Sequence, residues 1–211
     1  MLSFGELEGR ARILYEAQSS VRWGRDAFLK AANEGLDELS EAARFYERNA
    51  TIPLKGGQTY YDLRGFWPED AFAINSVYSN VQQTWLTPIG IRDLKVRRWE
   101  TVTGDPRRYI IRGLFWLGVY PRPSGHVGSL RVYFASLAPH FKDTYSVITA
   151  DFPDDFVSAL EHYILYDLAC RDAETKKALG YWADYQADEA ALKAFVADRL
   201  SSRAGALSGG P

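Results

Sequence analysis

PRRYIIRGLFWLGVYPRPSG, residues 106–125, says more about the fold than any other part of the chain. Two short runs, rich in β-branched and aromatic residues, are separated at Gly113 and followed by Pro121, Pro123 and a Ser-Gly turn. Proline has no amide hydrogen for a ladder bond, so the second run must lie at a sheet edge or leave the sheet there. The pattern predicts two strands ending in a stiff corner that displays Arg and aromatic side chains.

Short strands of this kind are predicted throughout residues 50–150, where Gly and Pro recur between apolar runs. The predicted strands cover residues 59–63, 73–78, 94–101, 109–111, 115–120 and 130–135. In the last of them Leu130, Val132 and Phe134 alternate with Arg131, Tyr133 and Ala135, which indicates one buried face. We expect a small antiparallel sheet, with the 106–125 corner packed on the 130–135 strand.

Helical spacing governs the two ends of the chain. Ser3 and Glu6 form a capping-box pattern, and residues 3–49 are predicted to form two helices. Acidic residues at 151–155 suit the positive end of a helix dipole and precede an apolar stripe. A further helix is predicted from Asp172 to about Leu200, followed by a flexible Ser-, Gly- and Ala-rich tail at 201–211.

These segments together predict an α+β fold. Its domains would be N-terminal bundle helices at 1–49, a β-rich insertion at 50–150, C-terminal bundle helices at 151–200 and the tail at 201–211. Helices from both termini would form one bundle, with the antiparallel β region inserted between them.

Composition narrows the class of protein. The 211 residues include 25 basic and 27 acidic ones, a net charge of −2, which argues against a protein that coats nucleic acid. Cys170 is the only cysteine, so no intrachain disulfide forms, and synthesis in a reducing cytoplasm fits. The N-terminus has no signal-peptide core, and the longest apolar run is too short to span a bilayer.

Signatures of catalysis are scarce. His126, His140 and His162 show no metal-ligand spacing, and the aspartates near residue 151 are better explained by helix capping. Ser124 lacks the strand–turn–helix setting of a nucleophile. We predict no catalytic residue, no metal and no cofactor.

The aromatic content, 14% of the chain, points instead to a contact surface. Trp, Tyr and Arg are the residues enriched among interface anchors. Three hypotheses stand for the Arg-bearing strand faces: solvated surface, protein interface or nucleic-acid contact. The protein-interface hypothesis names Arg107, Arg108, Trp116, Tyr120 and Arg122.

A second candidate surface lies on the last helix. Five alanines recur there at spacings of four, three, four and three, which is the seam spacing of helix–helix packing: Ala183, Ala187, Ala190, Ala194 and Ala197. Small residues allow two helices to approach closely, although alanine is also simply the best helix former. We predict a close helix contact through this alanine stripe.

Several short motifs, taken in order, resemble the head-to-tail connector (adaptor or neck) proteins of tailed bacteriophages. The resemblance covers residues 3 to about 200. Its marks are Ser3-Phe4-Gly5-Glu6-Leu7, Trp23, Asn33-Glu34, Tyr60-Tyr61-Asp62-Leu63, Pro106-Arg107-Arg108-Tyr109, Val119-Tyr120-Pro121-Arg122-Pro123, Leu130-Arg131-Val132-Tyr133 and Ala159-Leu160-Glu161-His162-Tyr163.

The resemblance implies a structural virion protein without catalysis, made in the host cytoplasm and located at the neck. Such a protein would form a homo-oligomeric ring of twelve copies beneath the portal protein. It would contact the tail or the next neck protein, and genome DNA would pass through its lumen without sequence-specific binding; no membrane is involved. The alternatives are a carbohydrate- or ligand-binding β module that uses exposed aromatics, and an enzyme of unknown type.

Overall fold

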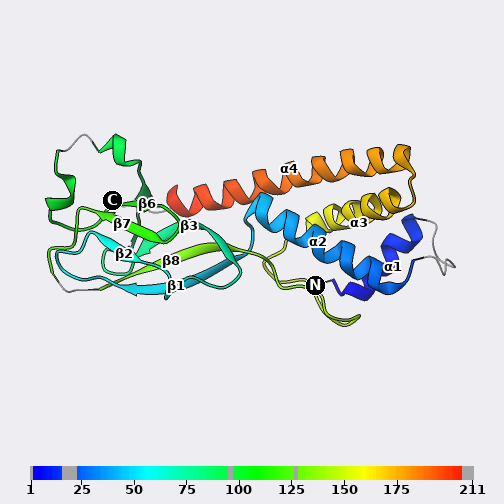
Figure 1. The fold of residues 1–211 in the computed structure, drawn as a ribbon, viewed down its shortest axis with the longest axis horizontal. Coiled ribbons are helices and arrows are strands. Elements are labelled where there is room, and N and C mark those ends of the chain that lie inside the picture. Colours follow the sequence, from blue (N-terminus) through cyan, green and yellow to red (C-terminus); the bar gives the residue numbers. More distant parts are fainter. Residues whose placement is uncertain (1, 16–22, 95–96, 126–127, 206–211) are drawn as a thin grey trace. The chain divides into compact units, whose positions relative to one another are not determined.

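The computed structural model describes residues 2–15, 23–94, 97–125 and 128–205 (Figure 1). The chain divides into two compact units. One is helical and combines residues 1–46 with 137–200, and the other is built on residues 47–136 and contains the strands. The prediction of an α+β fold, with terminal helices packed together and β structure inserted between them, is confirmed.

In the described part of the helical unit there are four α-helices: α1 (Phe4–Leu14), α2 (Arg25–Ala43), α3 (Val157–Arg171) and α4 (Thr175–Gly205). The predicted capping box begins α1, where Ser3 Oγ accepts from the Glu6 amide and Glu6 Oε2 accepts from the Ser3 amide at 2.8 Å. Such reciprocal bonds satisfy donors that the first turn leaves open. Apolar stripes from all four helices then close one core, which includes Leu7, Phe28, Leu36, Leu160 and Leu192.

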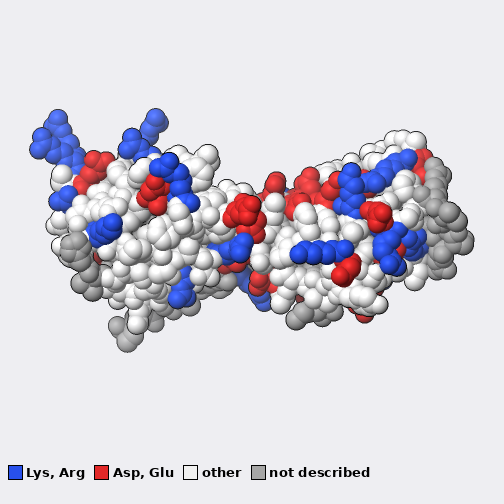
Figure 2. All heavy atoms as spheres, turned by 60° about the horizontal axis from the view of Figure 1, so that its bottom comes forward, with Lys and Arg blue, Asp and Glu red and all other residues white. Residues whose placement is uncertain are grey.

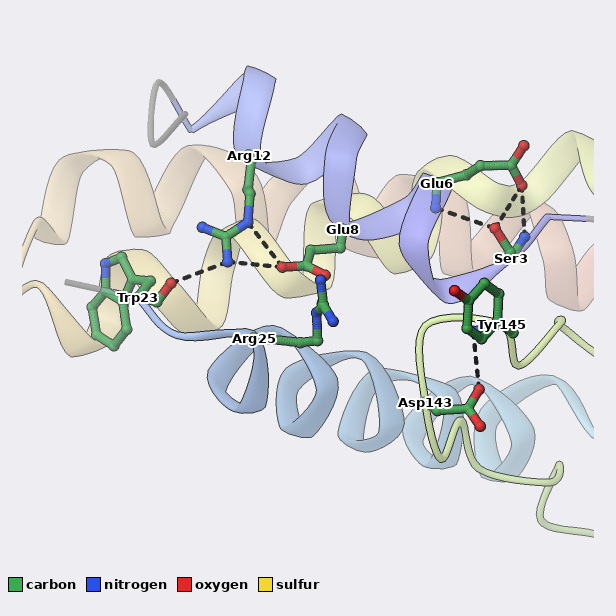
Figure 3. Close-up of polar contacts among 8 residues, drawn as sticks. All are labelled: Ser3, Glu6, Glu8, Arg12, Trp23, Arg25, Asp143 and Tyr145. Carbon is green, nitrogen blue, oxygen red and sulfur yellow. Dashed lines mark hydrogen bonds and ion pairs between the residues drawn. The ribbon is translucent and has the colours of Figure 1, made fainter. Parts of the chain in front are cut away.

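An ionic network centred on a buried carboxylate joins the first two helices (Figure 3). Glu8 is almost fully buried, and its carboxylate accepts from Arg12 at 2.8 and 2.9 Å and from Arg25 at 3.1 Å. Arg12 also donates to the Trp23 carbonyl and lies 4.2 Å from the centroid of the Phe28 ring. Both guanidinium groups therefore compensate the burial of the Glu8 charge.

The segment between the last strand and α3 packs on the helical core. Ala138, Phe141 and Ile148 from this segment belong to that core. Asn33 of α2 binds it twice, since its amide donates to the Phe141 carbonyl at 3.0 Å and its carbonyl accepts from the Phe141 amide at 2.9 Å. A single side chain thus satisfies both main-chain groups of Phe141.

Among its described residues, the β unit contains two four-stranded sheets, so the prediction of one small sheet is wrong. The first has the order β1 (Glu47–Pro53), β8 (Ser129–Ser136), β3 (Ala71–Ser79) and β4 (Thr84–Trp85). The second has the order β2 (Tyr60–Asp62), β7 (Trp116–Tyr120), β6 (Arg108–Arg112) and β5 (Thr87–Pro88). All pairs are antiparallel except β5 with β6, a short parallel pair that the sequence did not indicate.

The predicted packing of the 106–125 corner on the 130–135 strand is confirmed. Tyr109, Leu117 and Val119 share one core with Leu130, Val132 and Phe134. Of the two alternatives expected for the prolines, the edge position is wrong, because β6 and β7 are inner strands of their sheet. The chain instead leaves the sheet after Tyr120, where the Arg122 amide bonds to the Val102 carbonyl.

Two local predictions are corrected by the structure. The predicted strand at 94–101 is wrong for the described residues: Arg98 is left-handed and Trp99–Thr101 is a 3-10 helix, η2, because Leu94 and Trp99 must turn to cover Ile110. The N-terminal helical region also ends earlier than residue 49. Arg44 caps α2 in the left-handed conformation, and β1 begins at Glu47.

Aromatic side chains fill the space between α3 and α4. The Tyr163 and Tyr185 rings lie 5.2 Å apart, and the Tyr166 and Trp182 rings lie 4.7 Å apart. Burial raises the pKa of Tyr163 to about 12. The α4 helix begins at Thr175 and continues through Ser201 to Gly205, whereas the remainder of the predicted flexible tail lies outside the described residues.

Candidate protein–protein interface

The β6–β7 hairpin places most of the predicted interface residues on one face of the second sheet. Arg108 lies opposite Tyr120, and Arg112 lies opposite Trp116. Directly paired residues of antiparallel strands project to the same side of a sheet. This face therefore carries two Arg–aromatic pairs, one at each end of the hairpin.

An aromatic layer supports the middle of this face. Trp99 makes edge contacts with Tyr60 and Tyr120, at centroid distances of 5.9 and 6.3 Å, and the Arg112 guanidinium lies 5.6 Å from the Tyr60 ring. Gly118 permits this packing, since a Cβ there would lie 3.1 Å from the Tyr60 ring. Burial, reinforced by a hydrogen bond to Glu100, raises the pKa of the Tyr60 hydroxyl, which stays protonated at neutral pH.

A surface groove of about 400 Å³ lies at one end of the hairpin and is lined by Asp105, Arg107, Arg108, Tyr120 and Pro121. The backbone holds its walls in place, because the Arg107 amide donates to the Tyr120 carbonyl at 2.9 Å and its carbonyl accepts from Thr87 at 3.0 Å. Both Arg side chains are exposed. Two guanidinium groups at one groove can receive a carboxylate in bidentate geometry.

The five predicted β-region residues thus fall into three places. Arg107, Arg108 and Tyr120 come together at the groove, which we call the arginine groove. Trp116, 43% exposed, lies at the other end of the hairpin. Arg122 follows the corner, is partly buried, and has an Nε atom without a hydrogen-bond partner among the described residues.

Sequence reasoning missed an apolar tip beside Trp116. Leu114, in the turn between β6 and β7, is 72% exposed, and Ile111 is also exposed. The signal was present, because a glycine between two apolar runs indicates a tight turn, and Gly113 does adopt a positive φ there. These exposed apolar side chains make the tip a candidate contact surface.

Charge is distributed unevenly along the chain. Residues 47–136 contain 12 basic and 7 acidic residues, a net charge of +5, whereas the other segments contain 13 basic and 20 acidic residues, a net charge of −7. On the face shown in Figure 2, Lys and Arg side chains project from the β unit. The near-zero charge of the whole chain conceals this difference.

The predicted alanine stripe is exposed. Ala178, Tyr185, Leu192 and Val196 turn one side of α4 toward the helical core. The stripe lies on the opposite side, and all five of its members are exposed in this chain: Ala183, Ala187, Ala190, Ala194 and Ala197. A close contact through the stripe therefore requires a neighbouring chain, and it stays a prediction.

The described residues contain no group of three or more His, Cys, Asp or Glu side chains that could hold a metal ion. His140 contacts Asp37 at 2.8 Å and His162 contacts Asp188 at 3.0 Å, while His126 lies outside the described residues. Within the part of the chain that the structure describes, no helix combines the length and apolarity that crossing a membrane requires.

Comparison with known families assigns the chain to the structural adaptor proteins of phages, which are head–tail connectors. The particular family is the SU10 adaptor protein family: its model matches residues 2–208, so the chain belongs to it. The resemblance noted in the motifs is thereby confirmed. No curated protein matches the chain.

Proposed function

We propose that this protein forms the ring that connects the phage portal to the tail, with twelve copies surrounding a channel for genome DNA. Membership of the adaptor family supports a structural role in the virion and contact with head and tail proteins. The observation that carries the finer proposal is the pair of exposed surfaces, the arginine groove with its hairpin and the alanine stripe of α4.

The two surfaces suit different contacts. An alanine stripe along a 31-residue helix suits a close helix–helix contact between neighbouring copies. The arginine groove, with the Trp116 and Leu114 tip, suits a protein partner that supplies carboxylates and an apolar patch. We assign this surface to docking on the portal or on the next neck or tail component.

Genome DNA would pass such a ring without being held. Tight nucleic-acid binding requires many Lys and Arg contacts to phosphates. The net charge of −2 opposes strong retention, although the +5 of residues 47–136 allows weak local contact. The carbohydrate-binding alternative has less support, because Trp67, Trp85 and Trp99 are engaged by neighbouring rings.

The proposal is tested by measuring oligomer mass and thermal stability for Arg108→Ala and Trp116→Ala, alone and with the portal protein. Both side chains are exposed, so each variant should melt close to wild type, while a lost anchor should weaken assembly or docking by about 2 kcal/mol. Arg131→Ala is the matched control, since Arg131 is also an exposed arginine on a strand. Strongly lowered melting temperatures, or unchanged assembly and docking, would contradict the proposed interface.

A further inference from the structure

The loop between β8 and α3 presents an exposed Tyr on a fixed backbone. Tyr145 is 87% exposed and Val147 is 55% exposed. Asp143 Oδ1 accepts from the Tyr145 amide at 2.9 Å, the Ser146 amide at 2.8 Å and the Ser146 hydroxyl at 3.0 Å. These bonds form a closed polar turn that carries the exposed ring; Figure 3 shows the contact between Tyr145 and Asp143.

The N-terminus of α1 holds this turn from the other side. The Phe4 amide donates to the Ser146 carbonyl at 2.8 Å, and the Gly5 amide donates to the Thr144 carbonyl at 3.0 Å. Gly5 favours this approach, since a Cβ there would lie 2.7 Å from Thr144 Cγ2 and 3.2 Å from the Thr144 carbonyl oxygen. Because the loop is ordered before any contact, a partner that covers Tyr145 loses little conformational entropy. We call the exposed Tyr145 and Val147 the knob.

A complementary depression lies where α3 meets α4. This α3–α4 groove has a volume of about 430 Å³ and is lined by Tyr166, Cys170, Ala173, Thr175, Ala178, Leu179 and Trp182. The stacked Tyr166 and Trp182 rings belong to it, and Leu179 is 65% exposed at its rim. Most of its lining side chains are aromatic or aliphatic, and it is large enough to receive a Tyr ring.

Knob and groove lie at opposite ends of α1 and cannot meet within one copy. The knob is bonded to Phe4 and Gly5 at the N-terminal end. At the C-terminal end, the Tyr15 hydroxyl donates to Asp172, beside the groove, at 2.6 Å. The 11 residues of α1 separate these points by about 16 Å, and the knob loop is fixed. Contact between two such different patches is heterologous, and heterologous contacts form a ring when the rotation between copies closes.

Charge is compatible with the same pairing. Asp143 and Glu6 beside the knob are exposed, and hydrogen bonds from Ser146 and Ser3 respectively lower their pKa values, so both are ionised at neutral pH; Lys142, also exposed, adjoins Asp143. Lys176 is exposed in the first turn of α4, beside the groove. Of the acidic residues near it, Glu174 pairs with Lys177, whereas Asp172 keeps its negative charge and accepts from Tyr15 and Trp23. Lys176 is therefore the basic side chain beside the groove that Glu6 or Asp143 of the next copy would face.

We propose that Tyr145 of one copy inserts into the α3–α4 groove of the next copy. This contact rests on the proposed ring and specifies one of its subunit interfaces, separate from the arginine groove and the alanine stripe. The ring of Tyr145 packs against Tyr166 and Trp182 of the neighbour, and Val147 covers Leu179.

The single native cysteine allows a direct test in the full-length chain. Cys170 lines the groove, so Tyr145→Cys places one thiol on the knob and keeps one in the groove. Mild oxidation of this variant should give a ladder of covalent species larger than dimers, joined through positions 145 and 170. Wild type, and Tyr145→Cys combined with Cys170→Ala, have one thiol each and cannot exceed dimers. Peptide mass analysis identifies the linkage.

A second variant measures the strength of the contact. Tyr145→Ala should keep the wild-type melting temperature and weaken self-association by roughly 30-fold, as expected for an aromatic anchor, whereas Tyr145→Phe should retain most of the association. A wild-type ring that forms while the two-thiol variant gives no ladder overturns the knob contact and leaves the connector role intact. A ladder without portal binding keeps the contact and contradicts the connector role. A chain that is monomeric at all concentrations and gives no ladder also overturns the contact.

Discussion

Replacing Gly35 with Ala tests how closely α2 and α3 pack. A Cβ at Gly35 would lie 2.7, 2.9 and 3.1 Å from Cδ1, Cγ and Cβ of Tyr163. These atoms lie close to the α3 backbone, and the Tyr163 ring is held by contacts with Tyr166 and Tyr185. The ring therefore cannot move aside, and the two helices would have to separate.

Two opposing effects set the magnitude. Ala is favoured over Gly inside a helix by about 1 kcal/mol, whereas overpacking a tight contact costs about 1–3 kcal/mol. The net expectation is a loss of up to about 2 kcal/mol. Gly9→Ala in α1 is the matched control, since a Cβ at Gly9 meets nothing within 4 Å and only the helix gain of about 1 kcal/mol applies.

Urea denaturation of the two variants gives opposite signs if the reasoning is correct, with a difference of about 1–3 kcal/mol between them. Adding Tyr163→Ala removes the clashing ring atoms, so Gly35→Ala should become neutral or stabilising in that background. If Gly35→Ala stabilises the protein as much as Gly9→Ala does, the tight contact is not real.

Three further predictions follow from single contacts. Asn33→Ala should lower the free energy of unfolding by about 2–3 kcal/mol, because both main-chain groups of Phe141 lose their partner. The control Asn49→Ala, at an exposed position, should change it by less than about 0.5 kcal/mol, and equal melting curves for the two variants would contradict the prediction. Ala190→Leu should leave the melting temperature of the subunit unchanged but weaken ring assembly by about 1–3 kcal/mol, and normal rings would show that the alanine stripe faces solvent. Hydrogen bonds, first that from the Ser146 side chain, lower the pKa of Asp143. Its carboxylate therefore stabilises the loop above the unfolded pKa of about 3.9, and this stability is lost as pH falls through the lower folded pKa. The difference in loop hydrogen exchange between wild type and Asp143→Asn should be largest near neutral pH and vanish in acid.

The sequence predicted those elements whose signals are local. The Ser3–Glu6 box and the stripe through Phe28, Leu36 and Leu39 define α1 and α2 with little help from the rest of the chain. The strand at Glu47–Pro53 was not predicted, because its mostly polar residues form an edge strand specified by pairing with β8. The prediction of a strand near Trp99 was wrong because the conformation of this segment depends on packing over Ile110, which is not a neighbour in sequence.

The candidate surfaces show the same limit. Arg107, Arg108 and Tyr120 could be selected from residue type, but their meeting at one groove depends on the Arg108–Tyr120 register of β6 and β7. Tyr145 carried no sequence signal at all. Its exposure and its rigidity arise from bonds to Asp143 nearby and to the distant start of α1, which no periodicity reveals.

The chain enters and leaves the β unit through two paired strands, β1 and β8. Glu47, at the start of β1, pairs with Ala135, near the end of β8, so the first and last residues of this unit lie side by side. The helical and β units also have separate cores. A domain with adjacent ends can be exchanged, lengthened or removed without opening the scaffold that carries it. We therefore expect the β unit to be the replaceable module of this protein, in which lineages can adapt to a new docking partner while the helical scaffold is kept.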